Sequence, residues 1–511
     1  MSQEQNNEET ANVEEIVDVN DSSVIESIRQ VRIEKAKNLK EVGMDPYTAG
    51  PFEKISATEA LEAAEGTQVS IAGRVMSSRT MGNVTFGHLH DESGEIQFML
   101  SKKAVEEPDL PEPAYKFILK NLDVGDFVYI EGERIVTKVG EPTVLAKRFR
   151  IITKSLRALP EKHAGLKNED VLLRKRYLDI LQNREVQEMI YKKAIFWKST
   201  RRFLEDKGFI EVQTPILEHT TGGGDAKPFV THHNFLDAEV KLRISTGELW
   251  QKKLLVGGLE KVFEIGRQFR NENQSREHAN DYDQMEFYWA YANYGLGMDL
   301  VEELFKHIAQ ETFGTLTFEM NRFGKTHKVD LGAEWKRYDF CETIKEIAGV
   351  DINTDSDENL QQFVDKSGAD HEGPAVSRPK LIDRIWKVCR REITGPGFLV
   401  NELYELSPLA KRSPDSDTTV ERFHVLIGGS ELGNGYSELN DPVDQLERFE
   451  AQQQMRDSGD DEAQEANYDF VEALEYGMPP AVGFGMSERV FSFFMDKSLR
   501  ECQIFPLLRK E

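Results

Sequence analysis

The stretch from Val262 to Tyr291, VFEIGRQFRNENQSREHANDYDQMEFYWAY, decides the fold around it. Both of its ends alternate apolar and polar residues at a period of two, as strands with a buried face do. The residues predicted to face the core are Phe263, Ile265, Phe269, Met285, Phe287 and Trp289. We therefore predict an antiparallel hairpin with a polar opposite face. That face holds Glu264, Gln268, Arg270, Gln284, Glu286 and Tyr288.

The polar loop between the two strands is expected to lie over the edge of that polar face. It carries Glu272, Arg276 and His278, so charges of both signs gather beside Arg270 and Glu286. Such a cluster is a candidate binding site. Taken alone, the same residues also fit an ordinary amphipathic hairpin with a solvated face, and both interpretations stay open on these residues.

The composition indicates a folded protein of two or three domains. A chain of 511 residues is too long for a single core, and its 39% hydrophobic content is typical of globular proteins. No apolar run approaches the roughly 18 residues of a membrane span, so we expect a soluble, cytoplasmic protein. The three cysteines lack metal-ligand spacing, which favours free thiols in a reducing compartment.

The order of segments predicts the domains. Residues 1–22 are acidic and polar, as a disordered tail is, and residues 23–65 read as a basic helix followed by a linker. Residues 66–155 contain five short strands separated by Gly and Asp turns, which suits a small barrel of the oligonucleotide-binding type. The net charge of −26 argues against a protein that coats nucleic acid through its overall charge. From composition alone, a barrel that binds RNA and a barrel that binds nothing are equally compatible with residues 66–155.

Several motifs together resemble one enzyme family. The run FRNE, a basic loop and the return strand MEFY resemble motif 2 of the class II aminoacyl-tRNA synthetases, in the lysyl-tRNA synthetase version. FIEVQTPIL at 209–217 looks like motif 1, and AVGFGMSERVFSFF at 481–494 resembles motif 3. LIGGSELGNGYSELN at 426–440 matches the signature of the lysyl enzymes. The resemblance runs from about Gly66 to the end of the chain.

The resemblance implies a fold and a reaction. The fold class is α+β, with an antiparallel sheet flanked by helices in a catalytic domain at 156–511 and an OB-fold anticodon-binding barrel at 66–155. Such enzymes act as homodimers through motif 1. They activate lysine with ATP to lysyl-adenylate, with Mg²⁺, and transfer it to tRNA(Lys).

The resemblance also assigns roles to residues. It places Arg270 and Arg489 in catalysis. For lysine it implies Gly222, Glu248, Arg270, Glu286, Tyr288, Asn434, Tyr436 and Glu438. For ATP it implies Arg270, Glu272, Arg276, His278, Tyr282, Glu431 and Arg489. For the anticodon it implies Phe86, Gln97 and Glu141, although Phe86 fits a barrel core equally well.

Substrate choice follows from charge. Glu286 and Glu248 are expected to take the α-ammonium of the amino acid, with Glu438 and the Tyr288 hydroxyl at the far end. A buried carboxylate without a partner is costly, so this pocket favours a cationic side chain. Lysine fits, whereas arginine and ornithine stay open.

Two departures from the family pattern support rival interpretations. The expected magnesium ligand Glu431 has His424 seven residues earlier, where the family has a second carboxylate. Imidazole binds magnesium poorly, so one ion site is expected to be weakened or completed by water and phosphate. Motif 3 is also one residue short. The rivals are a class II paralogue that lysylates a non-tRNA acceptor and a catalytically inactive RNA-binding relative.

Overall fold

The computed structural model describes residues 22–106, 110, 112–160, 168–224, 226–367, 377–457 and 465–510. The chain divides into two compact units, Met1–Asn168 and Glu169–Glu511. The tail predicted for residues 1–22 lies outside the described residues, apart from its last residue. The domain boundary predicted after residue 155 stays a prediction.

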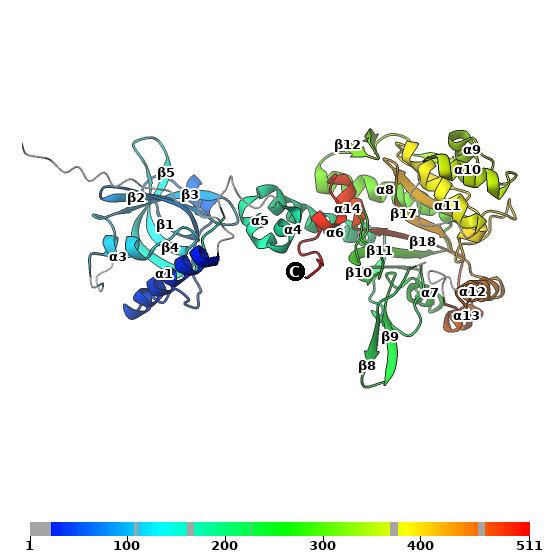
Figure 1. Ribbon diagram of the computed structural model, residues 1–511, viewed down its shortest axis with the longest axis horizontal. Coiled ribbons are helices and arrows are strands. Elements are labelled where there is room, and N and C mark those ends of the chain that lie inside the picture. Colours follow the sequence, from blue (N-terminus) through cyan, green and yellow to red (C-terminus); the bar gives the residue numbers. More distant parts are fainter. Residues whose placement is uncertain are drawn as a thin grey trace, which may run out of the picture. The chain divides into compact units, whose positions relative to one another are not determined.

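The first unit is built around a closed five-stranded barrel with strand order β1-β2-β3-β5-β4 (Figure 1). Its strands are β1 (Gln68–Met81), β2 (Val84–His90), β3 (Glu95–Ser101), β4 (Phe127–Val136) and β5 (Pro142–Thr153). The parallel pair β3–β5 closes the barrel, and the other pairs are antiparallel. Alternate side chains such as Ile71, Phe98 and Phe149 fill its interior. The predicted five-stranded barrel is confirmed.

Three helices pack against the barrel core. They are α1 (Ser22–Glu41), α2 (Ala57–Glu62) and α3 (Ala114–Asn121). Leu39, Ala60 and Phe117 carry these contacts, one from each helix. The basic helix predicted near the N-terminus therefore exists as α1.

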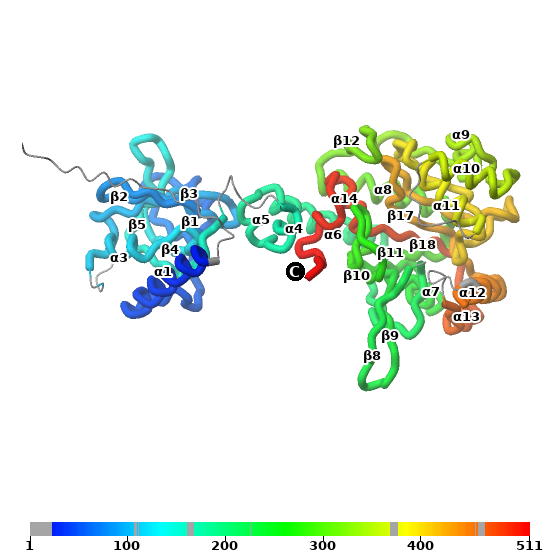
Figure 2. The backbone as a smooth tube through the Cα atoms, in the orientation of Figure 1, coloured from blue at the N-terminus to red at the C-terminus, as the bar shows by residue number. Residues whose placement is uncertain are grey.

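The second unit contains an eight-stranded sheet with order β14-β15-β16-β17-β18-β11-β10-β6. Its strands are β6 (Ile210–Glu211), β10 (Lys261–Phe269), β11 (Asp281–Ala290), β14 (Lys336–Asp339), β15 (Gly397–Val400), β16 (Arg422–Ile427), β17 (Ser430–Ser437) and β18 (Ala481–Ser487). Five of its seven pairs are antiparallel. In Figure 2 the red strand β18 lies between green β11 and orange β17, so the motifs at 262–291, 426–440 and 481–494 share one sheet.

The predicted hairpin is confirmed as β10 and β11, with Phe263 opposite Phe287 and Glu264 opposite Glu286. Its apolar face packs into the main core of the unit. The polar face is also buried, with Glu264 and Glu286 each 4% exposed. A single buried face was therefore the wrong expectation, because α7 (Glu248–Val256) packs on these strands and Arg243 pairs with Glu264 at 2.6 Å.

Helices cover both faces of the sheet. On the apolar face lie α6 (Arg184–Asp206) and α8 (Tyr294–Phe313), each started by an asparagine cap, Asn183 and Asn293. The opposite core joins α7 to α12 (Pro442–Asp457) and α13 (Tyr468–Glu475). The other helices are α4 (Glu169–Arg174), α5 (Arg176–Gln182), α9 (Phe340–Ala348), α10 (Asp357–Ser367), α11 (Arg378–Cys389), α14 (Arg489–Phe494), α15 (Leu499–Cys502), and the 3₁₀ turns η1 (Arg390–Glu392) and η2 (Tyr404–Leu406).

Two small sheets complete the unit. One has the order β7-β9-β8, from β7 (Leu217–Glu218), β8 (Val230–His233) and β9 (Ala238–Leu242), and its hairpin extends away from the main sheet (Figure 1). The other pairs β12 (Thr317–Arg322) with β13 (Lys325–Asp330). Within the described ranges, no helix is long and apolar enough to cross a membrane.

Candidate active site

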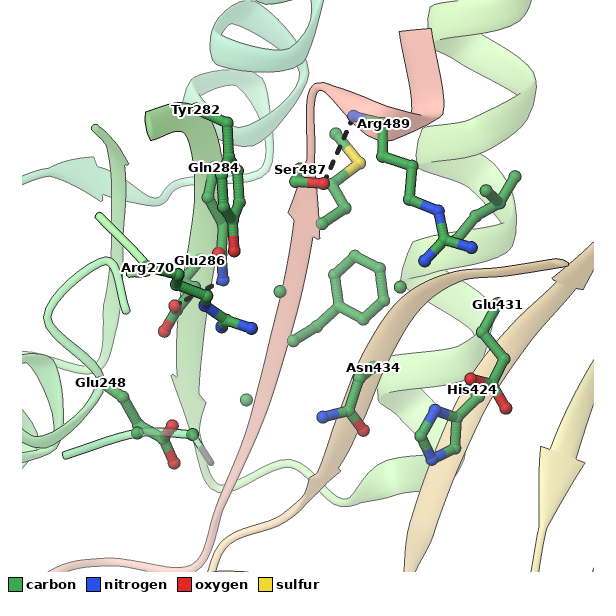
Figure 3. Close-up of a pocket in the computed structure, with 18 of the residues that line it drawn as sticks. Glu248, Arg270, Tyr282, Gln284, Glu286, His424, Glu431, Asn434, Ser487 and Arg489 are labelled. Carbon is green, nitrogen blue, oxygen red and sulfur yellow. Dashed lines mark hydrogen bonds between the residues drawn. The ribbon is translucent and has the colours of Figure 1, made fainter. Parts of the chain in front are cut away.

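A cavity of about 370 Å³ opens on the sheet of the second unit, between β11, β17 and β18. Its volume is within the range of about 300–1,000 Å³ that ligand pockets commonly have. In Figure 3, Arg270 and Glu286 lie on one wall, Asn434, Glu431 and His424 lie on the other, and Arg489 reaches in beyond the end of β18. Residues far apart in the chain thus meet because β18 joins the two halves of the sheet.

Most of the predicted site residues line this cavity. They are Glu248, Arg270, Glu272, His278, Tyr282, Glu286, Tyr288, His424, Glu431, Asn434, Tyr436, Glu438 and Arg489. Arg276 lines a neighbouring cavity instead, where its guanidinium donates to the backbone oxygen of Asp496 at 3.0 Å. Gly222 lies one residue outside, packed on Leu249, and its carbonyl accepts from Ser245 Oγ at 2.9 Å. Gly223 and Gly224 line the cavity in its place.

One end of the cavity is acidic. The carboxylates of Glu248, Glu286 and Glu438 meet there, and each residue is at most 5% exposed. Burial, together with the charge of Glu248, raises the pKa of Glu286 to about 7. Burial also raises the pKa of Glu438 to about 8, although Lys252 opposes that rise. This end of the cavity therefore favours a bound cation.

Hydrogen bonds fix two of these carboxylates. Glu286 accepts from the Thr246 backbone N–H at 2.8 Å, from Gln284 Nε2 at 2.7 Å and from the Tyr288 hydroxyl at 2.9 Å. Glu248 accepts from the Tyr436 hydroxyl. The Tyr288 hydroxyl thus bonds to Glu286, while its ring and Glu438 both lie beside Gly483. Tyr288 and Glu286 are two residues apart on β11, so their side chains share one face and bond to each other.

The partner of Glu438 is Lys252, which sequence reasoning missed. Its Nζ lies 2.6 Å from Glu438 Oε2 and 2.7 Å from Glu248 Oε1. Glu248 and Lys252 are four residues apart on α7, a spacing that places opposite charges side by side on a helix. That spacing was the available signal, but nothing in the sequence around it indicates Glu438.

Arg270 stands between the two ends of the cavity. Its Nε donates to the Ile244 carbonyl at 3.2 Å, and its guanidinium lies 5.8 Å from the centre of the Tyr282 ring. An added Cβ on Gly224 would lie 3.5 Å from Arg270 Nη2, so the glycine keeps the approach to the guanidinium open. Two terminal nitrogens thus remain directed into the cavity (Figure 3).

The other end of the cavity is cationic. Arg489 pairs with Glu277, a residue of the β10–β11 loop that sequence reasoning missed. Arg322 lies 3.9 Å from the same carboxylate. Burial by itself raises the pKa of Glu277, but the charges of three arginines lower it below its usual value. These are Arg489, Arg390 and Arg322. Three arginines therefore gather at this end, although Arg322 also lies 3.5 Å from Asp496.

Glu431 and His424 lie on the wall beside these arginines. Trp386 Nε1 donates to Glu431 Oε1 at 2.5 Å. Although burial raises it, Arg390, His424 and this hydrogen bond bring the pKa of Glu431 to about 2, so the side chain is an anion. His424 Nε2 lies 3.2 Å from Glu402 Oε2, which also pairs with Arg422 at 2.9 Å.

Glu431 fits magnesium that is shared with a phosphate ligand. Among the described residues, no group of three or more His, Cys, Asp or Glu side chains could hold a metal by itself. Magnesium is commonly held by one or two carboxylates together with water and substrate phosphates. Glu431 offers one such carboxylate in the cavity, whereas His424 is engaged by Glu402.

The three residues predicted for the anticodon lie in the barrel of the first unit. Phe86 is half-buried and is not part of the barrel core. Its strand neighbour His88 pairs with Gln97 across β2 and β3, and its Nε2 lies 3.3 Å from Glu141 Oε1. The amide oxygen of Gln97 accepts from Thr143 Oγ1 at 2.7 Å. The alternative that Phe86 belongs to the core is therefore wrong.

Comparisons with known proteins cover nearly the whole chain. Residues 168–509 match the family described as tRNA synthetases class II (D, K and N), and residues 69–152 match the OB-fold nucleic acid binding domain. The expected fold class is thereby confirmed.

Several curated relatives are similar over almost their full length. The lysine–tRNA ligase of Thermotoga maritima is 39% identical over 499 residues, which are 95% of this chain and 97% of the relative. That of Moorella thermoacetica is 39% identical, covering 94% of this chain and 97% of its own. That of Halalkalibacterium halodurans is 39% identical, covering 94% and 96%. The chain therefore belongs to the class II tRNA synthetases of the D, K and N group, in the lysine–tRNA ligase family.

Proposed function

We propose that the chain joins lysine to tRNA(Lys) in two steps at this cavity. Lysine and ATP first give lysyl-adenylate and pyrophosphate, and the lysyl group then passes to the terminal ribose of the tRNA. The observation that carries the proposal is one cavity with an acidic end and a cationic end. The side-chain ammonium of lysine, in addition to its α-ammonium, fits the acidic end, and the triphosphate of ATP fits the cationic end.

In the first step, the lysine carboxylate attacks the α-phosphate in line and pyrophosphate leaves. This step needs alignment and cations more than a strong base. We propose that Arg270 supplies both, because its planar guanidinium can bind a carboxylate oxygen and a phosphate oxygen together. Arg489 and His278 would bind the polyphosphate, with Arg276 at its outer end, Glu272 beside the loop and Tyr282 near the adenine.

Magnesium would arrive with ATP and be held by Glu431. The ion would neutralise charge on the phosphates during displacement. His424 is not proposed as a ligand, because imidazole is a poor partner for magnesium and Glu402 already engages it. The number of protein carboxylates at the ion is therefore one.

Lysine would be recognised by charge at its two ammonium groups. The α-ammonium would lie near Glu248 and Glu286, beside the Gly223 and Gly224 backbone, and the ε-ammonium would lie at Glu438. Asn434 would bond to the lysine carboxylate instead, because Arg422 Nε donates to its amide oxygen at 2.9 Å and only the donor NH₂ is left for the substrate. Tyr436 and Tyr288 would form the walls.

We further propose that the protein acts in the cytoplasm as a homodimer. Exposed apolar side chains gather around motif 1 and the small sheet. They are Ile210, Ile216, Leu217, Val230, Leu236 and Phe235, the last 90% exposed. Apolar patches of this kind support an interface with a second copy.

The barrel would bind the tRNA anticodon through Phe86, Gln97 and Glu141. A half-exposed Phe can stack on a base, and Gln and Glu can bond to base edges. The match of residues 69–152 to a nucleic-acid-binding fold favours tRNA over a protein acceptor. The retained Arg270, Glu431 and Arg489 favour an enzyme over an inactive RNA-binding relative.

The proposal is tested by amino-acid-dependent exchange of pyrophosphate into ATP, with each of the twenty amino acids, followed by tRNA charging. Exchange with lysine and subsequent charging of tRNA(Lys) are expected. Arg270→Ala should abolish exchange, whereas Arg267→Ala is the matched control, since Arg267, three residues earlier on β10, pairs with Asp281 and Asp283. Absence of exchange from folded protein with magnesium would overturn the proposal, and exchange without tRNA charging would favour the paralogue.

A further inference from the structure

Lys252 is one of the most enclosed charges among the described residues of the second unit, and the reaction leaves its role open. Its residue is 1% exposed, in the middle of α7. Two carboxylates contact its ammonium, Glu248 at 2.7 Å and Glu438 at 2.6 Å. Three aromatic rings surround the same nitrogen, with centroid distances of 5.8 Å for Tyr288, 5.3 Å for Tyr436 and 5.8 Å for Phe470. Burying a lysine so completely is costly, and both carboxylates are needed to offset that cost.

The groups that face Lys252 come from every element packed around it. Glu248 is on its own helix, Glu286 and Tyr288 are on β11, and Tyr436 and Glu438 are on or just after β17. The helix α13 contributes the uncharged ring of Phe470. All the charged groups among these also line the substrate cavity, whereas Lys252 itself lies behind them.

Glu438 is left incomplete by this arrangement. Its two carboxylate oxygens are buried without a hydrogen bond, although Oε2 has the ionic contact with Lys252. The Oε1 atom lies where a side chain on Gly483 would be, only 2.2 Å from an added Cβ, and Gly483 lines the cavity. One oxygen is therefore held by Lys252, and the other is a buried acceptor without a hydrogen bond to any described residue, beside Gly483, which lines the cavity.

The charges at the acidic end of the cavity can be counted against the charges of a bound amino acid. The three carboxylates Glu248, Glu286 and Glu438 face one lysine of the protein, so two negative charges are left when all are ionised. Free lysine carries two ammonium groups, while its carboxylate is matched by Arg270. An amino acid with a neutral side chain would leave one buried carboxylate without a cation.

We propose that Lys252 is a positioning residue that sets substrate specificity, by holding Glu438 and Glu248 from behind and reducing the pocket to the two negative charges that a dicationic amino acid requires. The inference rests on the proposed function. Lys252 touches no substrate in this scheme and acts only through the two carboxylates.

Removal of the Lys252 charge has a pH-dependent consequence. Burial already raises the pKa of Glu438, and Lys252 opposes that rise, so without Lys252 the carboxyl stays protonated to a higher pH. A protonated Glu438 cannot attract the ε-ammonium as an anion does. The loss of lysine binding should therefore be large at neutral pH and smaller at alkaline pH.

The test is lysine-dependent pyrophosphate exchange by Lys252→Met at pH 7 and pH 9. The KM for lysine should rise about 10- to 100-fold at pH 7, as expected for a weakened charged hydrogen bond, and less at pH 9. The kcat and the KM for ATP should change little. Lys253→Met is the matched control, because this neighbour on α7 points at Trp250, 4.7 Å from its ring, and should keep wild-type values.

A folded Lys252→Met protein with the wild-type KM for lysine at both pH values would overturn the inference about Lys252. The proposed function would still stand in that case, provided that the wild-type protein shows lysine-dependent exchange. Should Lys252→Met fail to fold, the pair is removed together in Lys252→Met/Glu438→Gln, since deleting both partners avoids an unpaired buried charge. That variant should have a raised KM for lysine that does not recover at pH 9. A wild-type KM in that variant would also overturn the inference, and wild-type protein without lysine-dependent exchange would instead reject the function.

Discussion

At the scale of single residues, the buried carboxylates at the acidic end of the cavity favour a cationic substrate, because an unpaired buried charge costs free energy. Glu286 has a hydrogen-bond donor on both oxygens, so it is stable without a ligand. Glu438 has only the Lys252 ammonium, at its Oε2, and its Oε1 has no hydrogen-bond donor among the described residues. Because an unsatisfied buried carboxylate costs free energy, the less satisfied residue gains most from a substrate ammonium.

The first prediction concerns Glu438. Glu438→Gln should raise the KM for lysine in pyrophosphate exchange about 10- to 100-fold, because a charge-assisted contact of roughly 1.5–3 kcal/mol is lost. The KM for ATP should stay near the wild-type value. Glu239→Gln serves as the control, since Glu239 is an exposed carboxylate on β9. An unchanged KM for lysine in Glu438→Gln would contradict the assignment of the pocket.

The second prediction concerns pH. The pKa of Glu286 and that of Glu438 are raised from 4.5 to about 7 and about 8 in the empty cavity. Because the pKa of each carboxyl is higher in the folded state than in the unfolded state, its protonation stabilises the fold, fully so below pH 4.5. That stabilisation is lost as the pH rises through 7 to 8. Lysine binds the ionised forms of these carboxyls, so each carboxyl must release a proton before lysine binds. Below pH 8, the affinity for lysine should therefore fall by up to about tenfold per pH unit for each proton released.

Titration calorimetry with lysine at pH 6, 7 and 8 checks this dependence. Binding should release protons to the buffer near pH 7, which is seen by comparing buffers of different ionisation enthalpy. In Glu438→Gln the dependence should be shallower. An affinity that is equal at pH 6 and pH 8 would contradict the pH argument.

At the scale of elements, the sequence predicts most where local periodicity is strong. The alternation in Val262–Tyr291 predicted β10 and β11. Asn434, Tyr436 and Glu438 follow one another at a spacing of two residues, and all three line the cavity. Lys252 and Glu277 could not be predicted in the same way. Their partners are Glu438, just after β17, and Arg489, the first residue of α14. Only the fold brings these residues near, and no local pattern records the contact.

The third prediction concerns the glycine-rich strand β18. A Cβ on Gly483 would lie 2.2 Å from Glu438 Oε1 and 2.6 Å from Tyr288 Cε1. Gly483→Ala should therefore raise the KM for lysine more than about tenfold, since a steric clash costs typically 1–3 kcal/mol. Gly295→Ala at the start of α8 is the control, with only Asn293 Oδ1 at 3.3 Å near the added carbon. Equal KM values for lysine in both variants would contradict the argument.

At the scale of the whole molecule, the two units have separate cores and separate chemistry. The barrel core and the cores of the second unit share no residue. A fold of this kind allows the reading of an RNA and the activation of an amino acid to be changed independently. Membership of both units in one family was predictable because their motifs occur in a fixed order along the chain.

The fourth prediction separates these activities. Phe86→Ala should raise the KM for tRNA(Lys) in charging about 5- to 100-fold, the effect of losing one base stack of about 1–3 kcal/mol. Pyrophosphate exchange without tRNA should be unchanged. Tyr47→Ala, a change of an exposed ring in the same unit, is the control. Equal charging kinetics for Phe86→Ala and the wild type would remove Phe86 from the anticodon assignment.

The ion pair between Arg489 and Glu277 has a consequence for the end of the catalytic cycle. In the empty site Glu277 pairs with Arg489, the residue proposed to bind the polyphosphate, so a triphosphate would have to displace it. A triphosphate with magnesium brings several charges to this exchange, whereas AMP, the by-product of transfer to tRNA, brings one phosphate. Glu277 would therefore be displaced by the triphosphate and return to Arg489 once pyrophosphate has left, because AMP has no further phosphate for that arginine.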